Sequence, residues 1–333
     1  MNLAPHILAH DNWLSWEDVM ELALYHPEQG YYSAHLQHIG YRGDFSTSAT
    51  MSDLPARSIV AHWRRACKAF GRCLPIIEIG GGNGDMALGI ARELGFWGRL
   101  RARYYMVDRS PGLRQLQAMV GGNFVRVYSR VEEALKRADG HAFIFCNELP
   151  DAFPARVFRY LGGSWHELGL SVQHGAITEQ PRPCPQLPPG SAFARWALEG
   201  QVVEVHSSYH RWYTDWQPLW KSGVFITIDY GEPVDSLYHR RPTGTLRGYK
   251  AHLLLSRDEL PALAGRCDIT ADVNFTDLQE LAASYPGDAV QLMLQRDFLR
   301  PLADPNSPAD AHLIATPGAG DHFRVLLQHR FSS

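Results

Sequence analysis

Between residues 75 and 146 the chain alternates short apolar runs with stretches of helical periodicity. The apolar runs that have the length and composition of buried strands are Ile76–Ile79, Arg103–Val107, Phe124–Val127 and Ala142–Cys146. Helical spacing of apolar residues predicts the connecting helices Asp85–Leu94, Pro111–Met119 and Val131–Arg137. Such alternation with short links is typical of a parallel sheet covered by helices on both faces.

Outside this region the pattern is less regular. Helices are predicted at Trp16–Leu24, Ser52–Phe70, Ser207–Lys221 and Thr276–Ser284, and strands at Val224–Ile228 and Phe323–His329. A glycine pair joins two segments that read as a hairpin, Val157–Leu161 and Trp165–Val172. Five prolines between residues 181 and 190 predict an extended loop, and residues 232–275 carry few periodic elements.

Composition and charge narrow the class of protein. Hydrophobic residues make up 45% and charged residues 20% of the 333 positions, ordinary values for a soluble globular protein. The net charge is −3, so the chain as a whole has no attraction to nucleic acid or to an anionic membrane. No apolar run approaches the roughly 18 residues of a membrane-spanning helix, and residues 1–16 lack the pattern of a secretory signal. We therefore expect a cytoplasmic protein without membrane insertion.

Cysteine and histidine spacing predicts neither disulfides nor a metal site. The five cysteines form no CxxC pair, and an odd, scattered set fits reduced thiols. The chain has 16 histidines, but they show no HExxH motif or paired spacing that would indicate a metal centre.

The sharpest motif is EIGGGNG at residues 78–84, between a predicted strand and a predicted helix. A ligand that lies over such a turn needs backbone without side chains, which the glycines provide. The carboxylate of Glu78 can accept a hydrogen bond from an ammonium group or a hydroxyl. Asp108 ends the next predicted strand, where nucleotide-binding folds place an acid that reaches the two hydroxyls of an adenosine ribose.

Two cofactors fit this layout, and a glycine-rich turn without a ligand is the alternative. Dinucleotide sites usually show G-x-G-x-x-G; from Gly80 the sixth position is Asp85, which fails, and from Gly82 it is an alanine, a weaker variant. S-adenosylmethionine (SAM) sites show an acid and then glycines at alternate positions, a register that Glu78, Gly80, Gly82 and Gly84 meet. Asp85 at the helix start also suits a cofactor without phosphates, because a helix N-terminus otherwise attracts an anion. We therefore favour SAM, with S-adenosylhomocysteine as the product.

The chain resembles the MidA-like class I methyltransferases, a family that includes the mitochondrial arginine methyltransferase required for respiratory complex I assembly. The matching segments are spread over most of the chain: Gly30–Tyr32, Gly43–Ser48, the glycine motif, Val107–Pro111, Asn147–Pro154, Ile228–Gly231, Gly244–His252 and Asp268–Phe275. The resemblance implies an α/β, Rossmann-like fold with a seven-stranded, mostly parallel sheet. It also implies four segments: an N-terminal cap (1–70), a SAM-binding core (71–155), an insertion with the fifth strand on the acceptor side (156–275) and the completion of the core sheet (276–333).

The resemblance and the glycine motif together assign the cofactor site. Gly43, Phe45 and Thr47 lie in a segment suited to backbone contact with the methionine end of SAM, and Asn147 follows the fourth strand, which ends beside the sulfonium in such enzymes. The full expected set is Gly43, Phe45, Thr47, Glu78, Gly80, Gly82, Gly84, Asp108 and Asn147.

Carboxylates are the candidate catalytic residues if the acceptor is a protein arginine, as the resemblance implies. A guanidinium pKa above about 12 keeps the acceptor cationic, so carboxylates must orient it and help it to shed a proton. Glu148 and Asp151 are three positions apart and would share a face of one helical turn, and Asp229 at the end of a later strand is a second candidate. The structural alternatives are a solvated acidic turn beside an asparagine cap for the first pair and a turn cap for Asp229.

Departures from the family leave the acceptor open. Ala49 and Thr50 stand where the family usually has a Pro-Glu pair, and Asp272 and Asn274 stand where it tends to have His and Asp. A protein substrate is expected; a small-molecule N- or O-methyltransferase and a non-catalytic SAM-binding assembly factor are the alternatives. Nothing in the sequence specifies an oligomeric state.

Overall fold

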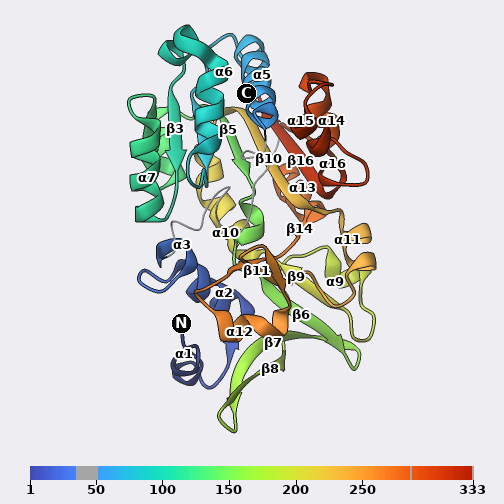
Figure 1. Ribbon diagram of the computed structural model, residues 1–333. Coiled ribbons are helices and arrows are strands. Elements are labelled where there is room, and N and C mark those ends of the chain that lie inside the picture. Colours follow the sequence, from blue (N-terminus) through green and yellow to red (C-terminus); the bar gives the residue numbers. More distant parts are fainter. Residues whose placement is uncertain (35–51, 286, 332–333) are drawn as a thin grey trace. The chain divides into compact units, whose positions relative to one another are not determined.

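The computed structural model describes residues 1–34, 52–285 and 287–331. The chain divides into two compact units. The first unit comprises residues 1–37, 150–213 and 231–278, and the second unit comprises residues 38–149, 214–230 and 279–333. Each unit has its own sheet structure, and Figure 1 shows the elements of both.

The second unit is built on a single, mostly parallel sheet. Its strands follow the order β15 (Asp288–Leu294), β16 (Phe323–Arg330), β10 (Ser222–Glu232), β5 (His141–Asn147), β2 (Ile76–Ile79), β3 (Tyr104–Val107) and β4 (Val125–Tyr128). From β10 to β4 all neighbours are parallel, whereas β16 is antiparallel to both of its neighbours. Counted over the described residues, seven strands lie on this path, which confirms the predicted α/β class (Figure 1).

Helices connect and cover these strands. They are α5 (Leu54–Ala69), α6 (Asp85–Arg101), α7 (Pro111–Gly121), α8 (Val131–Arg137), α14 (Gln295–Leu299), α15 (Pro308–Leu313) and α16 (Ala319–His322), with a 3₁₀ turn at Arg300–Leu302. α5 and α6 lie side by side (Figure 1), and Ile59 and Ile90 from them join Phe145 of the sheet in one buried core. Ser110 caps α7 by accepting a 3.3 Å hydrogen bond from the backbone N–H of Leu113, and a proline follows where a missing N–H costs nothing.

The chain order of the sheet reverses at β2. From β2 the chain moves outward to β3 and β4 on one side and then crosses to β5 and β10 on the other. The carboxyl ends of β2 and β5 are neighbours, since Ile79 pairs with Cys146. In open α/β sheets ligands bind at such a reversal, outside the carboxyl ends of the strands. The segments that follow β2 and β5 are therefore where a ligand is expected.

The first unit carries two antiparallel sheets. In the larger one, β7 (Ser164–Gln173) pairs with β1 (Leu14–Ser15), β6 (Arg156–Leu161) and β8 (Ala176–Pro183), and β6 also pairs with β9 (Val202–Val205). In the smaller one, β11 (Arg247–Lys250) pairs with β12 (Leu253–Leu255) and β13 (Asp268–Thr270). The last two residues of β10 belong to this unit and pair in parallel with β14 (Val273–Asn274).

Short helices accompany these sheets. They are α1 (Ala4–Ala9), α2 (Trp16–Tyr25), α3 (Tyr31–Ala34), α9 (Ala192–Arg195), α11 (Val234–Arg240) and α12 (Leu260–Leu263), with 3₁₀ turns at Pro150–Ala152 and Arg257–Glu259. α10 (Ser207–Trp216) and α13 (Phe275–Ala283) begin in the first unit and end in the second, and a 3₁₀ turn at Gln217–Leu219 follows α10.

The structure corrects several expectations about these elements. Residues 181–183 form the end of β8 and not a loop; among the described strands β8 pairs only with β7, and proline is tolerated in such an edge strand. Residues 232–275 hold several short strands and helices, although the sequence showed little periodicity there. Strand β15 was not predicted, and α6 continues beyond Leu94 to Arg101 through a kink at Gly95.

Over the described residues, no helix is long and apolar enough to cross a membrane. The same residues contain no group of three or more His, Cys, Asp or Glu side chains that could hold a metal ion.

Candidate active site

The glycine motif forms the turn between β2 and α6. Gly80, Gly82 and Gly84 have φ values of 69°, 51° and 90°, in the left-handed region where glycine carries no Cβ penalty. A Cβ on Gly80 would also lie 2.6 Å from Cδ1 of Leu149. The backbone conformation therefore favours glycine at the first of these positions, and a Cβ there would in addition displace the end of the Leu149 side chain.

Gly81 is a further requirement that the alternate-glycine register does not include. A Cβ at this position would overlap the terminal methyl group of Met106 on β3 and lie 2.8 Å from Cδ of Glu78. The turn thus packs closely against the end of the neighbouring strand. The alternate-glycine pattern does not predict this glycine, because the contact depends on how β2 and β3 lie together.

Glu78 is a buried acid within β2, with 2% of its surface exposed. The phenol of Tyr104 on β3 donates a 2.8 Å hydrogen bond to its Oε2. Burial raises the pKa of the Glu78 carboxyl from 4.5 to about 7, although the bond from Tyr104 opposes the rise. A cation beside this carboxyl would restore its ionised form.

Asp108 follows β3 and is held by two donors. The backbone N–H of Ser110 lies 2.9 Å from Oδ1, and the side-chain amide of Gln117 lies 3.0 Å from Oδ2. Burial raises the pKa of Asp108 to about 6, against the effect of both hydrogen bonds. A carboxylate offers about four lone pairs, so each oxygen keeps the capacity to accept from a ribose hydroxyl.

Gln117 connects the acid to the glycine turn. Its amide nitrogen donates both to Asp108 and, over 2.9 Å, to the backbone carbonyl of Gly82. The side chain is fully buried, so these bonds are shielded from water. Gln117 therefore fixes the position of Asp108 relative to the turn, a role that sequence analysis did not assign to it.

A carboxylate of the chain itself lies at the N-terminus of α6. Asp85 is the first residue of the helix, and its Oδ2 accepts a 2.7 Å hydrogen bond from the side-chain amide of Asn83. A carboxylate at this place satisfies the positive end of the helix dipole. A cofactor phosphate would therefore be repelled here, whereas a cofactor without phosphates would not be.

Asn147 is the last residue of β5, and Glu148 follows it, at the sheet reversal. The backbone N–H of Glu148 donates 2.8 Å to the carbonyl of Ile228 on β10, and Asn147 donates 3.1 Å from its amide to Oε1 of Glu148. Glu148 has a φ of 54°, an uncommon conformation for a residue with a side chain. The expectation that Glu148 and Asp151 share a helical turn is therefore wrong, since the 3₁₀ turn begins only at Pro150.

Asp151 belongs to the first unit, as do a second buried acid, Asp268, and two half-buried phenols, Tyr25 and Tyr32. Asp151 is 4% exposed, and its backbone carbonyl accepts from the N–H of Ala271. Tyr32 donates a 2.8 Å hydrogen bond to Asp268 and lies against the ring of Tyr25. Burial, followed by the charges of Asp268 and Asp151 among others, raises the pKa of Tyr32 well above its ordinary value.

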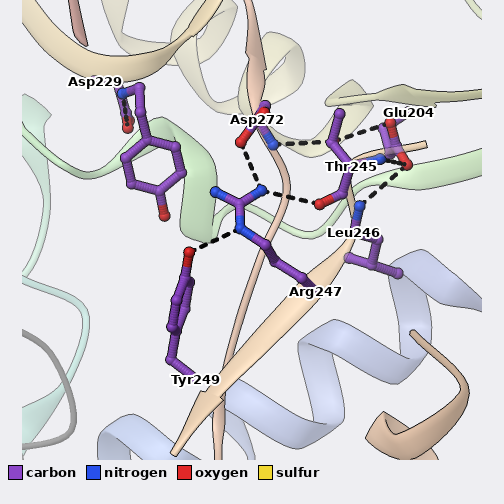
Figure 2. Close-up of polar contacts among 8 residues, drawn as sticks. Glu204, Asp229, Thr245, Leu246, Arg247, Tyr249 and Asp272 are labelled. Carbon is purple, nitrogen blue, oxygen red and sulfur yellow. Dashed lines mark hydrogen bonds and ion pairs between the residues drawn. The ribbon is translucent and has the colours of Figure 1, made fainter. Parts of the chain in front are cut away.

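Asp229 is fully buried near the end of β10, and its Oδ1 accepts a 2.8 Å hydrogen bond from the next backbone N–H, that of Tyr230 (Figure 2). This bond is consistent with a local capping role for the carboxylate.

A second polar group lies within the first unit (Figure 2). The buried Glu204 accepts from the backbone N–H of Thr245 at 2.7 Å and of Leu246 at 3.2 Å. One residue further along, Arg247 donates to Oδ1 of Asp272 at 2.6 Å and to the phenol oxygen of Tyr249 at 2.9 Å. Asp272, one of the departures from the family pattern, is thus an ion-pair partner of Arg247.

Of the remaining predicted positions, one has a structural role, and the others lie in a segment that the structure does not describe. Asn274 accepts from the N–H of Thr276 at 3.1 Å, which satisfies a free donor at the start of α13. The predicted cofactor residues Gly43, Phe45 and Thr47 and the departures Ala49 and Thr50 lie outside the described residues.

The strand order, the glycine turn and the acid after β3 define a class I methyltransferase fold. A family model described as "Putative S-adenosyl-L-methionine-dependent methyltransferase" matches residues 54–291, and the chain belongs to this family. This finding confirms the resemblance in the sequence and identifies SAM as the cofactor of the class.

Solved structures agree with this assignment. One similar structure is a COG1565 superfamily member from Burkholderia thailandensis bound to S-adenosylhomocysteine, with 27% identity and a TM-score of 0.84 over 98% of this chain and 90% of that chain. A native crystal structure of a protein of that superfamily and organism has 26% identity and a TM-score of 0.81 over the same shares. No curated protein matches the chain.

Proposed function

We propose that this protein transfers the methyl group of SAM to a nitrogen of a protein arginine. SAM supplies an activated electrophile, its sulfonium methyl group. In the reaction the carbon–sulfur bond breaks, a carbon–nitrogen bond forms, and the acceptor nitrogen loses a proton to a base. Catalysis of such an in-line displacement is mostly positioning, so the protein must hold both reactants and receive the proton.

Within this proposal the second unit holds the cofactor. Glu78 faces the cationic amino acid portion, Asp108 accepts from the ribose hydroxyls, and Asn147 lies at the end of the strand beside the sulfonium. Gly80, Gly82 and Gly84 leave room for the ligand over the turn. Gly43, Phe45 and Thr47 are assigned to the methionine end by family resemblance.

The observation that carries the arginine acceptor is a group of two buried acids and two half-buried phenols in the first unit, Asp151, Asp268, Tyr25 and Tyr32. The charges of Asp151 and Asp268 both act on the half-buried phenol of Tyr32. Buried carboxylates are stable when a cation pairs with them, and a guanidinium offers five donors for carboxylate and phenol oxygens. A neutral acceptor would gain nothing from these charges.

Three carboxylates are assigned to the acceptor. Glu148 and Asp151 would orient the guanidinium and accept the proton that it loses as the carbon–nitrogen bond forms, with Asp229 as a further acid near the end of β10. The uncommon backbone conformation of Glu148 supports this assignment, because strain of this kind is concentrated at functional sites.

The proposal is tested by methylation of an extract from cells that lack this protein. The extract is incubated with the purified chain and isotope-labelled SAM, and the labelled residue is identified by mass spectrometry. We expect label on arginine. Label confined to small molecules, or to lysine, would contradict the arginine proposal while leaving SAM-dependent transfer intact.

Matched variants distinguish a cofactor defect from an acceptor defect. Asp151→Asn should bind SAM normally but lose arginine labelling, whereas Asp108→Asn should weaken SAM binding itself. Asp297→Asn, an exposed acid on α14, is the control and should behave as the wild type. Wild-type labelling by Asp151→Asn would exclude this carboxylate from the acceptor site.

A further inference from the structure

The kink in α6 exposes three large apolar side chains on the second unit. Phe96, Trp97 and Leu100 are 61%, 73% and 66% exposed. The rings of Phe96 and Trp97 pack edge to face with centroids 5.2 Å apart. These residues thus form a continuous apolar projection at the end of the helix and are not isolated surface positions.

The exposure of Trp97 is a consequence of Gly95. The preceding part of α6 buries Met86, Ile90 and Leu94, and an unbroken helix would place Trp97 on the same face. Gly95 has φ 63° and ψ −175°, so the helix is interrupted there. The final turns are redirected, and the tryptophan faces solvent.

Arginines surround this projection. Arg99, Arg101 and Arg103 are exposed, and no acidic residue occurs between residues 94 and 107. The thiol of Cys73 donates to the carbonyl of Arg101 over 3.6 Å, which places the exposed Arg72 beside the same turn. Across the described residues, none of these four arginines has an ion-pair partner.

We propose that this arginine-flanked apolar projection, Phe96–Arg103 with Arg72, docks the protein on an anionic phospholipid surface. Tryptophan and phenylalanine with leucine insert at the boundary between headgroups and acyl chains, while arginines remain with the phosphates. Each basic side chain near such a surface also gains from its negative potential. The charge of the chain as a whole, −3, does not reveal this local excess of positive charge.

A second copy of the chain is a poorer occupant. A symmetric dimer through this projection would bring the same unpaired arginines against one another, and like charges across an interface are unfavourable. An acidic protein would satisfy the charges, but it would have to accommodate side chains that project outward from a single helix end. A lipid surface deforms around such side chains without a matching pocket.

The test measures binding of the full chain to vesicles by co-sedimentation. Vesicles of phosphatidylglycerol and phosphatidylcholine are compared with vesicles of phosphatidylcholine alone, at low and at raised salt. We expect binding only to the anionic vesicles, weakening with salt because the charges are screened. Absence of binding to anionic vesicles, or equal binding to both kinds, would overturn the proposal.

Variants assign the binding to the projection. The double variant Phe96→Ser, Trp97→Ser should lose vesicle binding, and Arg99→Gln, Arg101→Gln, Arg103→Gln together should weaken it on the order of 100-fold, from about fivefold per arginine. Leu8→Ser with Leu198→Ser is the apolar control, since both leucines are similarly exposed elsewhere. Lys136→Gln with Arg137→Gln is the charge control.

SAM affinity provides an independent measure that each variant is folded. Wild-type vesicle binding by the serine double variant would overturn the proposal. The proposal would also be overturned if the wild type bound no vesicles but bound an acidic protein that the double variant did not bind. It would be overturned as well if loss of self-association were the only effect of the double variant.

Discussion

The phenol of Tyr104 donates a 2.8 Å hydrogen bond to the buried carboxyl of Glu78, across neighbouring strands β3 and β2. This contact orients the acid whether or not it is ionised, because the phenol oxygen can also accept a hydrogen bond from the neutral carboxyl. Since burial raises the pKa of Glu78 to about 7, the carboxyl changes its charge in the physiological range. The affinity for a cationic cofactor should therefore depend on pH.

SAM affinity should rise with pH up to about pH 7 and then level off. The cation binds the ionised form of Glu78, so below this pH binding must release a proton and loses up to about tenfold in affinity per pH unit. Calorimetry in two buffers of different ionisation enthalpy measures the released proton directly. Glu78→Gln removes the titration and should weaken binding by about 10- to 150-fold at pH 8, from the loss of one charge-assisted hydrogen bond.

The control separates Glu78 from other titrating groups. Asp108, whose pKa burial raises to about 6, contributes its own dependence at lower pH, and Asp108→Asn should remove that part only. If Glu78→Gln kept the full pH dependence of the wild type around pH 7, the assignment of Glu78 to the cation would be wrong.

The same titration should affect the stability of the protein without SAM. The pKa of Glu78 is higher in the folded chain, about 7, than the ordinary 4.5, so the folded state binds the proton more tightly. The favourable contribution of the Glu78 proton to the free energy of unfolding is therefore complete below pH 4.5 and is lost as the pH rises through about 7. Glu78→Gln should not show this loss. Its midpoint of thermal unfolding should therefore rise relative to the midpoint of the wild type as the pH increases between these two values. Parallel curves for the two proteins would contradict the raised pKa.

Gln117 should act on the cofactor through Asp108 and Gly82. Gln117→Met keeps the volume of the side chain and removes both donors, leaving the Asp108 carboxylate and the Gly82 carbonyl without them. We expect SAM affinity to fall by about 10- to 100-fold, the cost of one neutral and one charge-assisted hydrogen bond, each in part replaced by water. Gln115→Met, on the exposed face of the same helix, is the matched control for titration calorimetry.

A direct role in holding the adenosine would have a different signature. If Gln117→Met and Asp108→Asn together lowered the affinity by the product of their single effects, the two residues would act independently, and the positioning role of Gln117 would be excluded.

The central part of the fold could be predicted from sequence because its strands are buried. β2 and α8 have the predicted bounds, since apolar runs and helical periodicity record which side chains leave water. β15 was missed because, among the described strands, it pairs only with β16 and keeps several half-exposed side chains, so its pattern is weaker.

The candidate site was predictable only where a motif carries it. The glycines and acids of the turn stand in a fixed register, whereas Gln117, which matches the family pattern, approaches Gly82 from 35 residues away, and no spacing predicts that contact. Trp97 is a further case, since an unbroken α6 would place it on the buried face of the helix, and the interruption at Gly95 turns it to solvent. Such contacts depend on how elements pack, which local patterns do not encode.

Replacing the carboxylate of Glu148 should impair transfer without affecting the cofactor. Glu148→Gln keeps a hydrogen-bond acceptor but loses the charge that would pair with a guanidinium. SAM affinity should stay within a few-fold, and kcat/KM should fall by about 10- to 150-fold. Equal loss of SAM affinity in Glu148→Gln and Glu78→Gln would make Glu148 a cofactor ligand, and an unchanged rate would exclude the carboxylate from acceptor binding.

Glu148 should also show a conflict between stability and activity. Its φ of 54° costs free energy for any residue with a Cβ, and glycine adopts this conformation without that cost. Glu148→Gly and Glu148→Ala both remove the carboxylate, so both should lose methyl transfer, but only the glycine variant relieves the backbone. We expect Glu148→Gly to exceed Glu148→Ala in free energy of unfolding by about 1 kcal/mol, measured by urea denaturation. If alanine were as stable as glycine, residue 148 would not be strained, and its conformation would give no support to a catalytic role.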